Sequence, residues 1–361
     1  MRVTWDRQQK KLVSPTRPLQ HIKEVPPPTP SQAPTQPQRE IQSKEQLIPA
    51  SADLWLDKLL PYLAPAIRPL LVQTIKEKKL TPDSISEIRL RVGRPLNINC
   101  NNGDILLRNV TAEELLQTLH LMSECSIYAF EEEFRQGYLT LPGGYRVGLA
   151  GRVVLEGGKV KTIHPVSSIN IRIARQLKGI GDAFLPHLLG SEESLFLSTL
   201  ILSPPGGGKT TLLRDLVRQL SLGRPDLALP GMTVGLVDER SEIAASYRGI
   251  PQNDVGPRTD VLDGCPKSEG LLRLLRSLAP KVLATDEIGR MDDVRAVEEA
   301  MHCGVSLLAT AHGHNYSDLD KRSGLRIMNQ LGLFQRIIIL SPRPQPGTLV
   351  AIYNEIGEKI N

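Results

Sequence analysis

The residues best suited to chemistry lie in a glycine-rich loop at positions 203–211, Ser-Pro-Pro-Gly-Gly-Gly-Lys-Thr-Thr. Three consecutive glycines let a backbone close around an anion with its N–H groups pointing inward. We expect Lys209 to reach the β- and γ-phosphates of a nucleotide, and the Thr210 hydroxyl to bind Mg²⁺. The residues predicted to bind the nucleotide are Ser203, Pro204, Pro205, Gly206, Gly207, Gly208, Lys209, Thr210 and Thr211.

The segments on either side of this loop are those that a phosphate-binding loop requires. An apolar run precedes it, and apolar residues with the spacing of one helix face follow it at Leu212, Leu213, Leu216, Val217 and Leu220. The phosphates would then lie at a helix N-terminus, where the helix dipole favours negative charge. A glycine-rich turn with a chance lysine is the alternative, and it leaves this agreement of strand, loop and helix unexplained.

A second motif is a short apolar run that ends in two carboxylates, Asp286 and Glu287. This pattern is typical of a buried parallel strand whose carboxyl end faces a ligand. We expect Asp286 to hold Mg²⁺ through water and Glu287 to polarise the attacking water as general base. Taken alone, Asp-Glu before a helix is also a common capping pattern.

Polar residues also follow two other predicted strands. Asp238, Glu239 and Arg240 come after one strand, and His312 comes after another. His312 is predicted to sense the γ-phosphate or position water, and the alternative is a solvent-exposed loop histidine. His312 and His314 without further ligands nearby do not predict a metal site.

A long loop rich in Gly, Pro and Asp spans residues 248–267 and contains Arg258. Loops of this length inside a domain are usually functional or disordered. Arg258 is predicted to stabilise the charge that develops on the transferred phosphoryl group, supplied by a neighbouring subunit. The alternative is that Arg258 only solvates the loop.

Composition narrows the class of protein. The 361 residues allow two domains with a core each. The four cysteines, at 100, 125, 265 and 303, show no paired spacing, which predicts free thiols and neither disulfides nor a zinc site. No apolar stretch approaches the ~20 residues of a membrane span, and the N-terminus lacks the apolar core of a signal peptide. We therefore predict a cytoplasmic protein with no direct membrane insertion.

Most of the excess positive charge lies in the first fifty residues. Of a net charge of +5, residues 1–50 contribute +4, from eight Lys/Arg and four Asp/Glu, and they hold nine of the 28 prolines. This predicts a disordered, proline-rich tail. The remaining chain is close to neutral and aromatic residues are only 4% of the total. No nucleic-acid partner is therefore expected.

Two folded domains are predicted after the tail. Residues 51–186 mix helices with short strands, including a capping box at Thr111–Glu114 and a strand broken at Pro165, which predicts a smaller α+β N-terminal domain. Residues 187–361 repeat strand, helix, strand, which predicts an α/β domain with a parallel sheet. Its strands are expected at 195–202, 233–237, 282–285, 305–310 and 336–340, with a closing hairpin to 349–353.

Seven segments in order resemble the stage III sporulation protein AA family, in the secretion-ATPase branch of P-loop ATPases that also contains type II and type IV pilus motors. They are residues 88–96, 145–152, 168–175, 237–243, 276–280, 286–290 and 309–313, within a match from about 54 to 353. The resemblance implies a RecA-like ATPase domain that binds ATP and Mg²⁺. It also implies that Asp238 and Glu239 belong to the family's aspartate box and His312 to its histidine box, with catalytic roles for Glu239 and His312. Two features depart from the family pattern, the proline-rich tail and Ser203 in place of the first loop glycine.

The resemblance further implies a homo-oligomer, a hexameric ring, held at the cytoplasmic face of a membrane by channel or secretion-complex proteins between mother cell and forespore. One alternative is a nucleic-acid-associated P-loop ATPase of a related plastid and cyanobacterial branch. Another is a nucleotide-gated scaffold with little turnover, against which Glu287 argues because a scaffold needs no general base.

Overall fold

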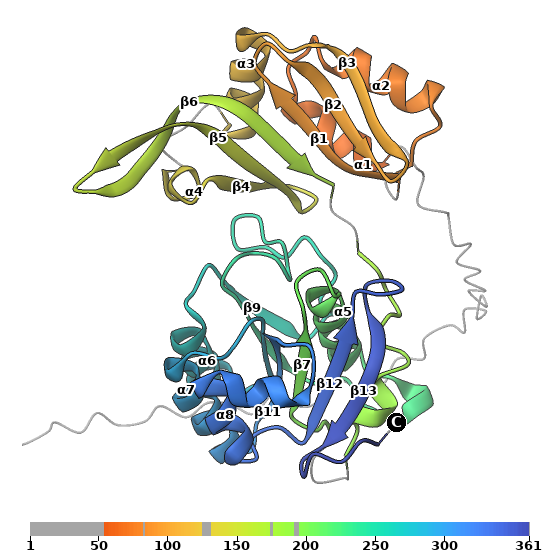
Figure 1. Cartoon of the computed structure of the whole chain (residues 1–361), viewed down its shortest axis with the longest axis vertical. Coiled ribbons are helices and arrows are strands. Elements are labelled where there is room, and N and C mark those ends of the chain that lie inside the picture. Colours follow the sequence, from red (N-terminus) through yellow and green to blue (C-terminus); the bar gives the residue numbers. More distant parts are fainter. Residues whose placement is uncertain (1–53, 82–83, 125–130, 174–175, 191–194, 361) are drawn as a thin grey trace, which may run out of the picture. The chain divides into compact units, whose positions relative to one another are not determined.

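The computed structural model describes residues 54–81, 84–124, 131–173, 176–190 and 195–360. The predicted tail at 1–50 lies outside these ranges. Within them the chain forms two separate sheets (Figure 1). The boundary at residue 186 between two domains stays a prediction.

The first sheet has six antiparallel strands in the order β3-β2-β1-β6-β5-β4. The strands are β1 (Ile85–Arg91), β2 (Pro95–Cys100), β3 (Gly103–Asn109), β4 (Tyr138–Leu141), β5 (Tyr145–Glu156) and β6 (Lys159–Arg172). The accompanying helices are α1 (Leu54–Leu59), α2 (Arg68–Glu77), α3 (Ala112–Met122) and α4 (Glu131–Gln136). The predicted capping box is confirmed, because the Thr111 hydroxyl accepts from the Glu114 N–H and the Glu114 carboxylate accepts from the Thr111 N–H.

The prediction that Pro165 divides a strand was wrong, since β6 runs through it without interruption. The partner strand β5 accommodates the proline by shifting register on both sides of Gly151. A Cβ atom at position 151 would lie 2.2 Å from the Pro165 carbonyl oxygen. The absence of a side chain at Gly151 therefore lets the two strands stay paired around the proline.

The second sheet has seven strands in the order β13-β12-β7-β11-β10-β8-β9, all parallel to their neighbours except β13. They are β7 (Thr199–Ser203), β8 (Val234–Asp238), β9 (Thr259–Asp263), β10 (Val282–Thr285), β11 (Ser306–His312), β12 (Arg336–Ser341) and β13 (Thr348–Asn354). The closing hairpin is confirmed as β12 and β13, in which Leu340 faces Leu349.

Helices cover both faces of this sheet (Figure 1). They are α5 (Lys209–Leu222), α6 (Lys267–Leu278), α7 (Met291–His302) and α8 (Ser323–Gln330). Side chains alternate along β7: Ile201 packs in the core with α5, whereas Leu200 and Leu202 pack in the core with α6, α7 and α8. The result is a layered α/β arrangement around a mainly parallel sheet, as the strand and helix pattern predicted.

One strand lies where a loop was expected. β9 pairs in parallel with β8 at the edge of the sheet, inside the predicted loop 248–267. Its sequence, Thr-Asp-Val-Leu-Asp, contains three polar residues, and only Val261 and Leu262 join the cores, as partly buried side chains. An edge strand needs little apolar surface, and for that reason hydrophobic periodicity did not reveal it.

Candidate functional site

The glycine-rich loop connects β7 to α5, as predicted. Gly206 and Gly208 have left-handed backbone conformations, with φ of 73° and 89°, which other residues reach only with strain. Because α5 begins at Lys209, the N–H groups of Lys209 and Thr210 have no acceptor in a preceding helical turn. These N–H groups and the positive end of the helix dipole together make an anion-binding position.

Ser203 replaces the first glycine of the usual pattern, and it fits because position 207 is glycine. A Cβ atom built on Gly207 would lie 1.8 Å from the Ser203 Oγ and 3.1 Å from the Ser203 Cβ. The Ser203 hydroxyl donates a 3.0 Å hydrogen bond to the Pro204 carbonyl. The Gly207 carbonyl accepts a 3.0 Å hydrogen bond from the Gly347 N–H, so the loop between β12 and β13 contacts the phosphate loop.

Three of the predicted residues form a continuous line of polar contacts. The Lys209 Nζ lies 3.2 Å from the His312 Nδ1, and the His312 Nε2 lies 3.0 Å from a Glu287 carboxylate oxygen. An ammonium group only donates and a carboxylate only accepts, so a neutral imidazole with its proton on Nε2 satisfies both contacts. His312 therefore ends β11 in contact with Lys209 and Glu287, and it is not a solvent-exposed loop histidine.

The carboxyl end of β11 fixes the backbone that carries Glu287. The Glu287 N–H donates to the Thr310 hydroxyl at 2.9 Å, and the next N–H, of Ile288, donates to the Thr310 carbonyl at 2.8 Å. Glu287 has a φ of 43°, which is an unfavourable conformation for a residue with a side chain. These two hydrogen bonds to Thr310 hold the strained turn and aim the Glu287 carboxylate at His312.

The Lys209 side chain is buried against the backbone of the glycine-rich loop. Its Nζ donates to the carbonyl oxygens of Ser203 at 3.3 Å and Pro204 at 3.4 Å. Burial lowers the pKa of this amine, and the carboxylates of Glu287 and Asp286 oppose that change. Both carbonyl contacts are long for hydrogen bonds, so little is lost when the ammonium turns toward a phosphate.

Asp238 shapes the loop that follows β8. Its carboxylate accepts the N–H groups of Glu242, Ile243 and Ala244 at 2.8–3.0 Å. Burial raises the pKa of Asp238 to about 6, although the backbone N–H donors oppose the rise. The same loop is tied to α5, because Arg214 donates to the Glu242 and Ile243 carbonyls at 2.7 and 2.6 Å.

Asp286 has the chemistry expected of a magnesium ligand. The residue is only 2% exposed, and its Oδ1 accepts no hydrogen bond from the residues that the structure describes. A buried carboxylate oxygen without a hydrogen bond is left for a cation. Over the same residues, no group of three or more His, Cys, Asp or Glu side chains could hold a metal alone. Thr210, nucleotide phosphates and water would have to complete the coordination of Mg²⁺.

Comparison with known proteins now places the chain. The family described as sporulation stage III, protein AA, matches residues 57–360. Stage III sporulation protein AA of Bacillus subtilis is 47% identical over 278 residues, which are 77% of this chain and 89% of that protein. This chain belongs to the stage III sporulation protein AA family.

Two further relatives are more distant. Protein SEEDLING PLASTID DEVELOPMENT 1 of Arabidopsis thaliana is 26% identical over 45% of this chain and 22% of that protein. The ycf45 protein of Porphyra purpurea is 28% identical over 46% of this chain and 30% of that protein. Each of these two matches covers less than half of this chain.

Solved structures support the fold of this family member. The ATPase DotB of Legionella pneumophila superposes with a TM-score of 0.51 at 14% identity, covering 76% of each chain. The pilus retraction motor PilT with bound ADP superposes with a TM-score of 0.50 at 16% identity, covering 78% of this chain and 81% of PilT. The protein is thus a homologue of stage III sporulation protein AA with the fold of secretion-type ATPases.

The predicted arginine, Arg258, does not lie near the phosphate loop of its own chain. Its guanidinium donates to the carbonyls of Ser221 and Leu222, at the last turn of α5. Since α5 runs 14 residues from Lys209, that end lies about 20 Å from the loop. Within one chain Arg258 caps a helix, and its role toward a neighbouring subunit stays a prediction.

Sequence reasoning named Arg240 without giving it a role, and it missed Lys267. Arg240 lies 3.4 Å from a Glu287 carboxylate oxygen, and Lys267 pairs with Glu239 and Asp286. Arg240 had a usable signal, because it follows the predicted strand 233–237 together with Asp238 and Glu239. Lys267 had a weaker one: a lysine in the first turn of a helix opposes the helix dipole and needs a compensating carboxylate.

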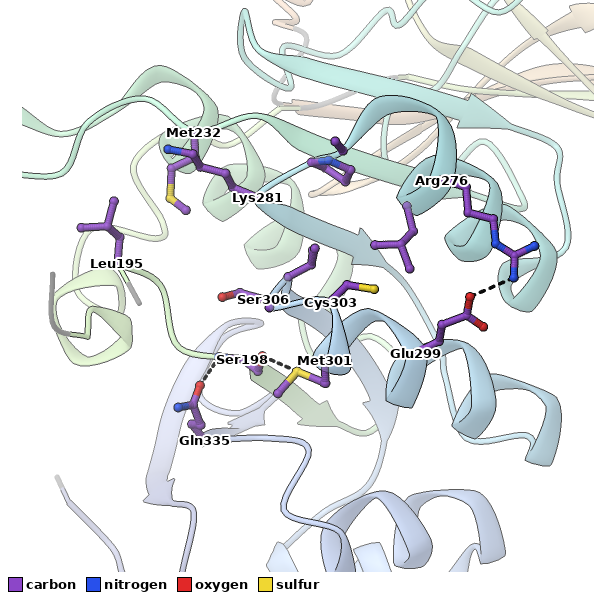
Figure 2. Close-up of a pocket in the computed structure, with 15 residues that line it drawn as sticks. Leu195, Ser198, Met232, Arg276, Lys281, Glu299, Met301, Cys303, Ser306 and Gln335 are labelled. Carbon is purple, nitrogen blue, oxygen red and sulfur yellow. Dashed lines mark hydrogen bonds and ion pairs between the residues drawn. The ribbon is translucent and has the colours of Figure 1, made fainter. Parts of the chain in front are cut away.

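A separate cavity of about 820 Å³ lies at the other edge of the sheet (Figure 2). Its lining includes Ser198, Lys281 and Ser306, which precede or begin β7, β10 and β11. Arg276 and Glu299 close one side of it with a 2.8 Å ion pair. Ligands of open α/β sheets bind at the carboxyl ends of the strands, so the glycine-rich loop stays the predicted nucleotide site despite the size of this cavity.

The structure also shows whether any of its helices could span a membrane. Among the residues that it describes, no helix combines the length and the apolar character needed to cross a bilayer.

Proposed function

We propose that this protein is a Mg²⁺-dependent ATPase that works as a homo-oligomeric, hexameric ring. In this proposal the ring drives or assembles a secretion-like channel complex during sporulation, and the protein reaches the membrane through partner proteins. The observation that carries the ATPase proposal is the line of contacts from Lys209 through His312 to Glu287 at the carboxyl edge of the sheet.

Each residue of this line has a distinct task. Lys209 exchanges its two carbonyl contacts for the β- and γ-phosphates of ATP. Glu287 accepts the proton of the water that attacks the γ-phosphorus, while the bond to the ADP oxygen breaks. His312 holds the Glu287 carboxylate at 3.0 Å and links its position to that of Lys209. Thr210 and Asp286 would hold Mg²⁺, whose chemistry when bound is to neutralise charge on the phosphates.

The loss of Lys209 tests the binding step. Lys209→Ala should weaken the affinity for ATP by about 10- to 100-fold, because charge-assisted hydrogen bonds contribute about 1.5–3 kcal/mol. Lys281→Ala is the matched control, because Lys281 lines the cavity at the amino edge of the sheet. If Lys281→Ala weakens ATP binding and Lys209→Ala does not, the nucleotide site has been assigned to the wrong edge.

The loss of Glu287 tests the chemical step. Glu287→Gln should keep ATP bound and lower hydrolysis by about 10²- to 10⁴-fold, as expected for removal of a general base. Single-turnover hydrolysis and calorimetric ATP binding separate the two effects. Full turnover in this variant would remove Glu287 from the mechanism.

Assembly is tested separately from chemistry. Native mass spectrometry with and without ATP gives the number of subunits, and hydrolysis per subunit should rise with protein concentration if the ring forms the active state. Specific activity that stays constant down to a monomeric protein would contradict the ring. Pull-down of membrane proteins by the Glu287→Gln variant, trapped with ATP, would identify the channel partner.

A further inference from the structure

Lys267 is the first residue of α6, and its side chain lies among the carboxylates of the candidate site. Its Nζ forms an ion pair with Glu239 and lies 3.6 Å from the Asp286 Oδ1. The residue is only 8% exposed. One nearly buried positive charge therefore lies between two carboxylates to which sequence reasoning assigned chemistry.

This is an unfavourable place for a lysine unless carboxylates hold it there. A buried ammonium group loses its hydration. Without a nearby carboxylate, no interaction in the protein offsets that free-energy cost. The first turn of α6 adds to the cost, because the helix dipole is positive at that end. Among the residues that the structure describes, the carboxylates of Glu239 and Asp286 lie within 4.0 Å of the Lys267 Nζ and offset both costs.

Two cations could pair with Asp286: the Lys267 ammonium and the Mg²⁺ that Asp286 is predicted to bind. Among the described residues, the Asp286 Oδ1 accepts no hydrogen bond, and its ion-pair partner is Lys267. Burial raises the pKa of the Asp286 carboxyl, and the Lys267 ammonium opposes that rise. An ammonium 3.6 Å from the Asp286 Oδ1 neutralises part of the charge on the carboxylate that would bind a divalent ion.

We propose that Lys267 is a built-in counter-ion of the magnesium position: it neutralises Asp286 and Glu239 in the nucleotide-free protein, and Mg²⁺ must compete with it. This inference rests on the proposed function, since it describes how the nucleotide site takes up its metal. Lys267 is a positioning residue, because it touches Asp286 and not the reacting atoms.

The proposal predicts two effects of opposite sign. Without Mg²⁺, the Lys267 charge attracts the anionic nucleotide and supports its binding. With Mg²⁺, the same charge repels the metal ion and raises the Mg²⁺ concentration that is needed for binding. A merely structural role for Lys267 would instead weaken nucleotide binding by the same factor in both conditions.

Lys267→Met, which removes the charge and keeps the length of the side chain, tests this in the full chain. Binding of a fluorescent ADP analogue is titrated in EDTA and at a series of Mg²⁺ concentrations. The Mg²⁺ midpoint should fall by about tenfold, which corresponds to about 1.4 kcal/mol, while the affinity in EDTA weakens or stays constant. Lys267→Arg should retain the wild-type midpoint, and Lys281→Met should leave it unchanged.

The outcomes separate this inference from the proposed function. A wild-type protein that binds no ADP analogue at saturating Mg²⁺ contradicts the proposed nucleotide site. A wild type that binds, together with an unchanged or raised midpoint in Lys267→Met, overturns the counter-ion role alone. Circular dichroism and thermal unfolding show whether the variant folds, and Lys267→Gln, which keeps a donor for Glu239, replaces it in the same titration if it does not.

Discussion

Gly207 and Ser203 should be coupled, so that alanine at position 207 is tolerated only when position 203 is glycine. The reason is steric: the Cβ atom that alanine adds would lie 1.8 Å from the Ser203 Oγ and 3.1 Å from the Ser203 Cβ. Gly207 has no positive φ, so its backbone accepts alanine without strain. The clash with Ser203 is then the main cost of the substitution.

The size of the effect can be estimated from the contacts. In Gly207→Ala the Ser203 hydroxyl must rotate and lose its hydrogen bond to Pro204, which costs about 1 kcal/mol. The remaining overlap is an overpacking cost of about 1–3 kcal/mol. In the double variant Ser203→Gly with Gly207→Ala, one tight contact remains, 3.1 Å to the Pro204 carbonyl. The coupling between the two sites should therefore be about 2 kcal/mol.

Urea unfolding of the wild type, the two single variants and the double variant measures this coupling without nucleotide. Binding of a fluorescent ATP analogue to the same four proteins shows whether the cradle recovers with stability. Gly208→Ala is the control, because its clash is with the Gly347 backbone at 2.8 Å and its φ is 89°. Ser203→Gly should not rescue it.

Additive effects at positions 203 and 207, with a coupling below about 0.5 kcal/mol, would refute this reasoning. Rescue of Gly208→Ala by Ser203→Gly would refute it as well. In either case, the absence of a side chain at Gly207 would not explain why the loop accommodates Ser203.

Further predictions concern the strands around the site. Thr310→Val should lower kcat for ATP more than it changes the affinity for ATP, because the Glu287 N–H loses its acceptor; equal changes in both would argue against a positioning role. Asp238→Asn should alter the pH dependence of stability. The wild-type carboxyl has a folded pKa of about 6 against 3.8 unfolded, so its contribution is fully present below about pH 4 and is lost as pH rises through about 6. The difference in unfolding free energy between wild type and Asp238→Asn should then fall by about 2 kcal/mol from pH 4 to 7, and a difference independent of pH would contradict the raised pKa. Arg258→Ala should lower the free energy of unfolding by about 1–2 kcal/mol through the lost carbonyl contacts at the end of α5; lost turnover at unchanged stability would instead support its action on a neighbouring subunit.

Much of the site could be predicted because parallel strands bring distant residues to one edge. Lys209, Glu287 and His312 each follow a strand in the sequence, and the carboxyl ends of neighbouring parallel strands meet in space. The order of the strands was not needed for this inference. Knowing only that these strands belong to one parallel sheet predicts that the three side chains lie at the same edge of it.

The remainder depended on contacts that no local pattern records. Lys267 meets Asp286 because the start of α6 lies beside the ends of β8 and β10, and this packing involves residues 19 positions apart or more. Arg258 was assigned to chemistry because of its place in a long loop, whereas the structure forms β9 there and directs the arginine to α5. Pro165 was read as a strand break because the compensating glycine, Gly151, lies on the partner strand.

The strand order has a consequence for how the protein is made. β7, which carries the phosphate loop, is the first strand of its sheet in the chain, yet its two neighbours are β11 and β12. The strands that are synthesised next, β8 to β10, pair with one another and not with β7.

During synthesis β7 therefore has no partner strand until about a hundred further residues have left the ribosome. The hydrogen bond from Gly347 to Gly207 forms later still. A nascent chain that stops before residue 306 carries the whole glycine-rich sequence but lacks the strand that positions it. We expect such fragments to bind no nucleotide, so the ability to bind it appears only after β11 has been synthesised.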